Sequence, residues 1–110
     1  MKNSNDSINE TEILPIAILG GGNIGTAIAG GLIASNLLPV ESITITRRDI
    51  KSLDYLREMG IKTTSNNVEA VQNSRIIILA VRPLQLVDLI HNIRDHLDPD
   101  KHIILSVASG

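Results

Sequence analysis

The segment from Ile16 to Leu32 constrains the fold more than any other part of the chain. It begins with a short apolar run, continues through glycines spaced G-x-G-x-x-G, and passes without a gap into an amphipathic helical pattern. A strand that turns directly into a helix in this way is typical of the first βα unit of a dinucleotide-binding sheet. The glycines that carry this spacing are Gly20, Gly22 and Gly25.

Each of these glycines has its own task in such a turn. Gly20 permits the tight turn, Gly22 lets backbone N–H groups approach a pyrophosphate, and Gly25 lets the helix pack closely on the strand. The start of the helix adds unpaired N–H groups and a partial positive charge. Asn23 can contact a phosphate or ribose of the cofactor and can cap this helix, and the two roles can hold together. Ile24 belongs to the same turn.

The rest of the chain repeats the alternation of strand and helix. We expect further strands at 42–46, 61–64, 75–81 and 102–107, and helices after Asp49, at 66–72 and at 83–97. This order predicts an α/β fold, a Rossmann-like doubly wound parallel sheet of five to six strands in the order 3-2-1-4-5. The cofactor then lies across the carboxyl ends of strands 1 and 4.

Several packing expectations follow from the helical patterns. Asp49 is expected to cap a helix that carries Ile50, Leu53, Leu56 and Met59 and stops at Gly60. The helix at 83–97 is expected to bury Leu86, Val87, Ile90 and Ile93. Gly30 and Gly31 lie inside the first helix, where each costs roughly 1 kcal/mol relative to alanine, so we expect close helix–sheet packing to compensate.

The composition indicates one globular domain. The 110 residues divide into a flexible N-terminal extension, residues 1–13, and a dinucleotide-binding domain, residues 14–110. Tyr55 is the only aromatic residue and the net charge is −2 with dispersed basic residues, which argues against nucleic-acid binding. The N-terminus has no apolar signal region and no apolar run could span a bilayer. With no cysteine, the chain fits a cytoplasmic protein.

The end of the second strand indicates which nicotinamide cofactor is bound. An acidic residue there would bind the ribose 2′-hydroxyl of NAD, whereas an arginine accommodates the 2′-phosphate of NADP. The sequence reads Thr46-Arg47-Arg48-Asp49. The threonine can donate a hydrogen bond and one or both arginines can pair with a phosphate. We therefore expect NADP (NADPH), with simple solvation of both arginines as the alternative.

Four features of the sequence, the glycine turn among them, match the motifs of one known family and their spacing. The glycine turn resembles G-x-G-N-M-G, with Ile24 in place of methionine, and Leu79–Pro83 (LAVRP) resembles L-A-V-K-P. Asn67 matches an asparagine after the third strand, and Ser106–Gly110 (SVASG) resembles S-x-A-A-G. Together they resemble the N-terminal domain of pyrroline-5-carboxylate reductase, an enzyme of proline biosynthesis, from about residue 15 onwards.

The resemblance implies an NADP(H)-binding domain of an oxidoreductase that reduces 1-pyrroline-5-carboxylate to proline. The family's helical C-terminal domain, which forms the dimer and supplies much of the imino-acid pocket, has no counterpart here, so we expect these residues alone to be catalytically incomplete. The cofactor-binding residues are expected to be Gly20, Gly22, Asn23, Ile24, Gly25, Thr46, Arg47, Arg48, Asn67, Ala80, Val81, Arg82, Pro83 and Ala108.

Some roles and some functions stay open at this point. Asn67 either meets the adenosine end of the cofactor or caps the helical turn that follows it, and Pro83 either lines the site or only starts a helix. No catalytic residue and no metal ligand is assigned, and His91, His96 and His102 are read as surface or partly buried histidines. Alternative functions are a deazaflavin-dependent NADP reductase, a hydroxy-acid dehydrogenase or a non-catalytic NADP-binding module. We also expect weak homo-oligomerisation through an apolar face near Val81, Pro83 and residues 108–110.

Overall fold

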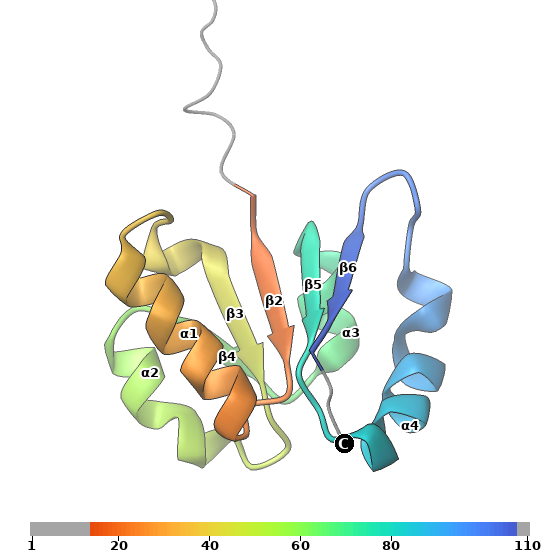
Figure 1. Ribbon diagram of the computed structural model, residues 1–110, viewed down its shortest axis with the longest axis horizontal. Coiled ribbons are helices and arrows are strands. Elements are labelled where there is room, and N and C mark those ends of the chain that lie inside the picture. Colours follow the sequence, from red (N-terminus) through yellow and green to blue (C-terminus); the bar gives the residue numbers. More distant parts are fainter. Residues whose placement is uncertain (1–13, 108–110) are drawn as a thin grey trace, which may run out of the picture.

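The computed structural model describes residues 14–107, and the proposed N-terminal extension and Ala108 lie outside this range. Its centre is one sheet of five parallel strands in the spatial order β4-β3-β2-β5-β6 (Figure 1). The order confirms the predicted arrangement 3-2-1-4-5. The strands are β2 (Ile16–Leu19), β3 (Ile43–Thr46), β4 (Lys62–Thr64), β5 (Ile76–Leu79) and β6 (Ile103–Ser106).

Four α-helices and three short 3₁₀ helices connect the strands. The α-helices are α1 (Asn23–Ser35), α2 (Asp54–Glu58), α3 (Asn67–Gln72) and α4 (Pro83–Ile93), and the 3₁₀ helices are η1 (Val40–Ser42), η2 (Ile50–Leu53) and η3 (Arg94–His96). Helices α1 and α2 cover one face of the sheet, and α3 and α4 cover the other (Figure 1). All five strands run the same way, so their carboxyl ends and the loops after them share one edge.

Alternate residues of the central strands fill two separate apolar clusters. Ile16 and Ile18 of β2 face α1 and α2, whereas Ala17 and Leu19 face α3 and α4. All four residues of this strand are buried. The sequence of a strand that is buried on both faces is a continuous apolar run, which explains why this segment could be identified as a strand from the sequence.

The helix expected after Asp49 has a different form. Asp49 precedes a 3₁₀ turn, η2, and its side chain makes no capping hydrogen bond. A 3₁₀ turn has three residues per turn, so it changes the phase of the apolar pattern before α2 begins. Leu53 and Leu56 are buried as expected, but Ile50 and Met59 are exposed.

The predicted buried face of α4 is confirmed for Ile93 and is wrong for Val87 and Ile90, while Leu86 is partly buried against the second cluster. Val87 is 61% exposed and Ile90 is 38% exposed, whereas Leu89 and Ile93 are buried. Apolar residues occupy more than one face of this segment, so the helical period alone does not decide which face meets the sheet. In the structure the stripe with Leu89 and Ile93 packs on the second cluster.

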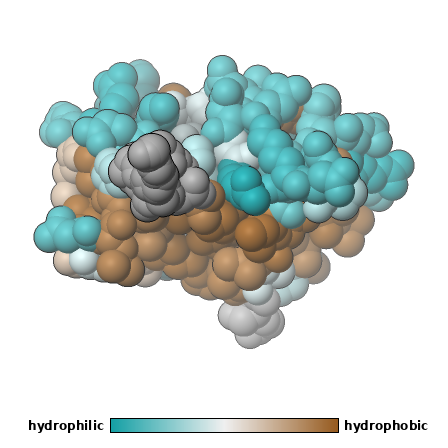
Figure 2. All heavy atoms as spheres, turned by 90° about the horizontal axis from the view of Figure 1, so that it is seen from above, coloured by the Kyte–Doolittle hydropathy of each residue, from teal (hydrophilic) through white to brown (hydrophobic). Residues whose placement is uncertain are grey.

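Strand β6 is apolar but exposed. Ile103, Ile104 and Leu105 keep between 44% and 50% of their surface exposed, and Val107 keeps 38%. Ile103 and Leu105 are in register with Ile76 and Ile78 of β5, so they lie on the face of the sheet that carries α1. Figure 2 shows apolar residues gathered along one side of the molecule and polar residues along the other. Within residues 14–107, no helix is both long enough and apolar enough to cross a membrane.

Candidate dinucleotide-binding site

The glycine turn between β2 and α1 has the geometry that its sequence predicts. Gly20 has a φ of +114°, which side chains disfavour, and a Cβ there would lie 2.9 Å from the carbonyl oxygen of Ala80. A Cβ on Gly25 would lie 1.8 Å from the carbonyl oxygen of Gly20. The first glycine therefore permits the turn, and the third permits the close approach of α1 to the strand.

The second glycine of the motif opens onto free space. A Cβ on Gly22 would meet no atom within 4 Å, and this residue is the N-cap of the 13-residue helix α1. The first turn of α1 contains no acidic residue, so no side chain there competes with an anion for its backbone N–H groups. This open cradle at a helix N-terminus fits the pyrophosphate of a dinucleotide.

The structure decides one of the roles left open for Asn23. The N-cap of α1 is Gly22, and no side chain makes a capping hydrogen bond there. Asn23 is instead the first residue of the helix, and it is exposed beside Ile24, which is 41% exposed. The capping role of Asn23 is therefore wrong, and its side chain stands at the same open edge as the cradle.

The two arginines after β3 have different environments. The Nη1 of Arg47 donates a hydrogen bond to the carbonyl oxygen of Gly21 at 3.1 Å, and its backbone N–H donates to Thr64. Arg48 is exposed and makes no hydrogen bond or ion pair with any other residue in 14–107. Arg47 thus stabilises the glycine turn, whereas the guanidinium N–H groups of Arg48 at the sheet edge have no acceptor within residues 14–107.

Thr46 and Asn67 bond to each other. The Oγ1 of Thr46 donates to the Oδ1 of Asn67 at 2.5 Å and accepts from the backbone N–H of Gly20 at 3.2 Å. The capping role left open for Asn67 belongs to its neighbour, because the Oδ1 of Asn66 accepts from the N–H of Glu69 at 3.0 Å. Capping by Asn67 is therefore wrong.

The residues after β5 reach the same edge of the sheet. Ala80 is buried and donates its N–H to Leu19, and the side chain of Val81 comes close to Gly20. Pro83 is the first residue of α4, as predicted, and Arg82 is its exposed N-cap. The backbone N–H of Arg82 donates to the Oε1 of Gln85 at 3.3 Å, and the exposed side chain of Arg82 makes no hydrogen bond or ion pair with any residue in 14–107. Ala108 lies outside the described residues.

The steric role of one glycine was not predicted from the sequence, and the packing predicted for two others is wrong. A Cβ on Gly21 would lie 2.8 Å from the Cδ2 of Leu53 and 3.2 Å from the Cβ of Arg47, so this position also excludes larger residues. The run of three consecutive glycines was the available signal. A Cβ on Gly30 or on Gly31 would meet no atom within 4 Å, so the expected close packing at these two positions is wrong.

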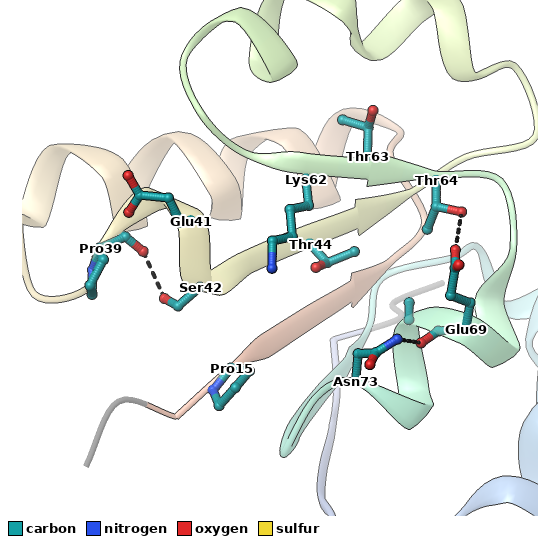
Figure 3. Close-up of a pocket in the computed structure, with 11 residues that line it drawn as sticks. Pro15, Pro39, Glu41, Ser42, Thr44, Lys62, Thr63, Thr64, Glu69 and Asn73 are labelled. Carbon is teal, nitrogen blue, oxygen red and sulfur yellow. Dashed lines mark hydrogen bonds between the residues drawn. The ribbon is translucent and has the colours of Figure 1, made fainter. Parts of the chain in front are cut away.

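A separate cavity lies away from the glycine turn. It has a volume of about 740 Å³ and lies on the face of the sheet that α3 covers, beside Thr44 of β3 and Lys62 of β4. Figure 3 shows its polar lining, with the Oγ1 of Thr64 donating to the Oε1 of Glu69 at 3.0 Å. Gly20, Gly22 and Gly25 do not line it, so it does not mark the dinucleotide site.

The histidines have ordinary surroundings. His102 accepts a hydrogen bond at Nδ1 from the N–H of Asp98 at 2.9 Å, and its Nε2 lies 3.0 Å from the carbonyl oxygen of Val71. His91 is exposed, and His96 lies 3.4 Å from Gln72. Residues 14–107 hold no group of three or more metal-ligating side chains in a suitable arrangement.

Comparison with known families identifies the kind of domain. A family model described as NADP oxidoreductase, coenzyme F420-dependent, matches residues 15–110. The chain belongs to this family. The match covers every element from β2 to β6, including the glycine turn and the loops that meet it.

Among the relatives of this family member are pyrroline-5-carboxylate reductases. Pyrroline-5-carboxylate reductase 2 of Dictyostelium discoideum is 42% identical over 96 residues, which are 86% of this chain and 32% of the relative. Pyrroline-5-carboxylate reductase 1 of the same organism is 40% identical over 95 residues, 86% of this chain and 17% of the relative. The chain therefore spans a third or less of the length of these two relatives.

A solved structure shows the same fold. The pyrroline-5-carboxylate reductase of Coxiella burnetii superposes with a TM-score of 0.83 at 32% identity, over 90% of this chain and 37% of that one. These comparisons confirm the Rossmann-like fold and the predicted resemblance. The chain carries the domain that this family model describes, and it is similar to the corresponding part of pyrroline-5-carboxylate reductases.

Proposed function

We propose that residues 14–110 bind NADP(H) across the carboxyl edge of the sheet and present it for reduction of 1-pyrroline-5-carboxylate to proline in the complete enzyme. One observation carries the proposal: the open cradle at Gly22 and the exposed Arg48 follow the carboxyl ends of two neighbouring parallel strands, β2 and β3, and Arg48 bonds to no residue in 14–107. The cradle fits a pyrophosphate, and the arginine fits a 2′-phosphate. When bound, the cofactor supplies the hydride, and the protein orients it and limits the access of water.

The residues of the edge divide into three groups in this proposal. The backbone of residues 20–25 holds the pyrophosphate, with Asn23 and Ile24 flanking it. Arg48 faces the 2′-phosphate, Arg47 holds the glycine turn through its bond to Gly21, and Asn67 faces the adenosine end. Ala80, Val81, Arg82 and Pro83 border the nicotinamide half, and Ala108 stays a predicted cofactor-binding residue. No residue among these is proposed as a proton donor.

The substrate is tested by a chimaera. The part of the chain that aligns with the Dictyostelium pyrroline-5-carboxylate reductase 2 replaces the matching part of that enzyme, over 96 aligned residues that are 42% identical. We expect the chimaera to oxidise NADPH when 1-pyrroline-5-carboxylate is added, and the 110-residue chain alone to show no turnover. A folded chimaera that binds NADPH but does not reduce this imine would contradict the proposed substrate.

The description of the family favours a second candidate. It names NADP oxidoreductases that depend on coenzyme F420. The same NADP(H) site would serve this reaction with a different second substrate. Adding oxidised F420 in place of the imine to the chain and to the chimaera distinguishes the two candidates.

We also propose weak self-association of the isolated chain. Pro83 is exposed and Leu84 beside it is 95% exposed, whereas Val81 is half-buried and residues 108–110 lie outside the described residues. The exposed apolar strand β6 lies at the end of the sheet, so among the described residues one of its edges is unpaired. An exposed apolar edge strand favours pairing with a strand of another chain.

The cytoplasmic location stays a prediction, which fractionation of cells expressing the chain would test.

A further inference from the structure

A buried hydroxyl joins three loops of the candidate site. Thr46 is the last residue of β3 and only 2% exposed. Its Oγ1 accepts the N–H of Gly20 at 3.2 Å and donates to the Oδ1 of Asn67 at 2.5 Å. One side chain therefore links the glycine turn, the end of β3 and the start of α3.

The geometry fixes which atom of the Asn67 amide faces Thr46. The atom that faces the Oγ1 of Thr46 is the Oδ1 of Asn67, and an amide oxygen can only accept a hydrogen bond. A hydroxyl has one proton, and that of Thr46 is given to the Asn67 oxygen. The Nδ2 of Asn67 must therefore point away from Thr46.

The helix that begins at Asn67 does not need this amide. Asn66 caps α3 through its own Oδ1, and Asn73 at the other end donates to the carbonyl oxygen of Glu69 at 2.9 Å. Within residues 14–107 the Asn67 amide nitrogen donates no hydrogen bond to the protein. Its two N–H groups are therefore held in a fixed direction at the half-exposed edge of the site, with no acceptor in this part of the chain.

We propose that Thr46 is a positioning residue for NADP(H), which does not touch the cofactor but turns the Asn67 amide so that its N–H groups donate to an oxygen on the adenosine side. This inference rests on the proposed function. Ribose hydroxyl and phosphate oxygens accept such bonds, whereas a flipped amide would present its own oxygen to them and repel a phosphate. Because Thr46 fixes the amide before binding, less conformational freedom is lost when the cofactor arrives.

A double-mutant cycle on the 110-residue chain tests this role. NADPH affinity is measured by fluorescence titration for the unchanged chain, Thr46→Val, Asn67→Ala and the double variant. Valine has nearly the shape of threonine but has no hydroxyl. We expect each single substitution to raise the Kd for NADPH about tenfold. We expect the double variant to be no weaker than Asn67→Ala, because Thr46 acts through Asn67.

Thr46→Ser is the matched rescue. It restores the hydroxyl, so its Kd should stay within about threefold of the unchanged chain. All variants are titrated at a temperature where circular dichroism shows them folded, which separates binding from any loss of stability at Gly20. Additive effects in the cycle, or a Thr46→Ser variant as weak as Thr46→Val, would overturn the positioning role while leaving NADPH binding intact. If the unchanged chain fails to bind NADPH, both the proposed function and this role are overturned.

Discussion

The carbonyl oxygen of Gly20 and the α-carbon of Gly25 are in direct contact, so that a methyl group on Gly25 would lie 1.8 Å from that oxygen. Both atoms belong to backbone, and neither can move without shifting the end of β2 or the first turn of α1. The helix is thereby held with its N-terminus over the carboxyl end of the central strand, which is where an anion is bound in dinucleotide-binding sheets.

Gly25→Ala should therefore destabilise the domain, by roughly 1–3 kcal/mol, because a buried overlap forces the backbone to shift. Gly30→Ala in the same helix is the matched control. Its methyl group would enter open space, and alanine is the better helix former, so it should raise stability by about 0.5–1 kcal/mol. Urea unfolding measures both changes. Equal effects of the two substitutions would contradict the close contact.

The two arginines should have different roles: Arg47 in the affinity for both nicotinamide cofactors, and Arg48 in the preference for NADPH over NADH. Arg48→Gln removes only the free guanidinium, so it should weaken NADPH about tenfold or more and NADH less than about threefold. Arg47→Gln breaks the bond to Gly21 and should weaken both cofactors. Titration of each variant with NADPH and NADH checks this. If Arg48→Gln binds NADPH as well as the unchanged chain does, Arg48 has no role at the 2′-phosphate.

His102 should contribute to stability. Its ring bridges the N–H of Asp98 and the carbonyl oxygen of Val71 and so ties the start of β6 to the end of α3. His102→Ala removes both bonds and should cost about 1–3 kcal/mol. The melting temperature would then fall by several degrees, roughly 4–8 °C for each kcal/mol in a domain of this size. His91→Ala, at an exposed position, should change it by no more than about 0.5 kcal/mol; a similar loss in both variants would argue against the bridge.

Self-association should depend on β6. Leu105 is 50% exposed on this edge strand, and Leu105→Lys places a charge on its apolar face. We expect sedimentation velocity to show concentration-dependent association of the unchanged chain and much less association of the variant. A strictly monomeric unchanged chain at high concentration would contradict the proposed interface.

The sequence was sufficient where a single local pattern determines the structure. Strand order follows from alternating elements and right-handed crossovers, and the tasks of Gly20 and Gly25 follow from their positions in one turn. Pro83 was correctly placed at the start of a helix, because its ring fixes the backbone angle that the first turn requires. These features depend on residues close together in the chain.

Features that depend on distant residues could not be predicted. Thr46 and Asn67 are 21 positions apart, and either side chain could have bonded elsewhere. The exposure of Val87 depends on which side of α4 meets the sheet, and the pattern offered more than one apolar side. Whether a side chain at position 30 would meet other atoms depends on how α1 lies over the sheet, which the local sequence does not determine.

Isothermal titration of the 110-residue chain with NADPH and with NADH tests the central claim most directly. Gly22→Ala serves as the matched control, because its methyl group meets no protein atom within 4 Å but enters the space assigned to the pyrophosphate. We predict that NADPH binds at least about tenfold more tightly than NADH, and that Gly22→Ala loses both while keeping its melting temperature. Equal affinity for the two cofactors, or unchanged binding by Gly22→Ala, would contradict the account.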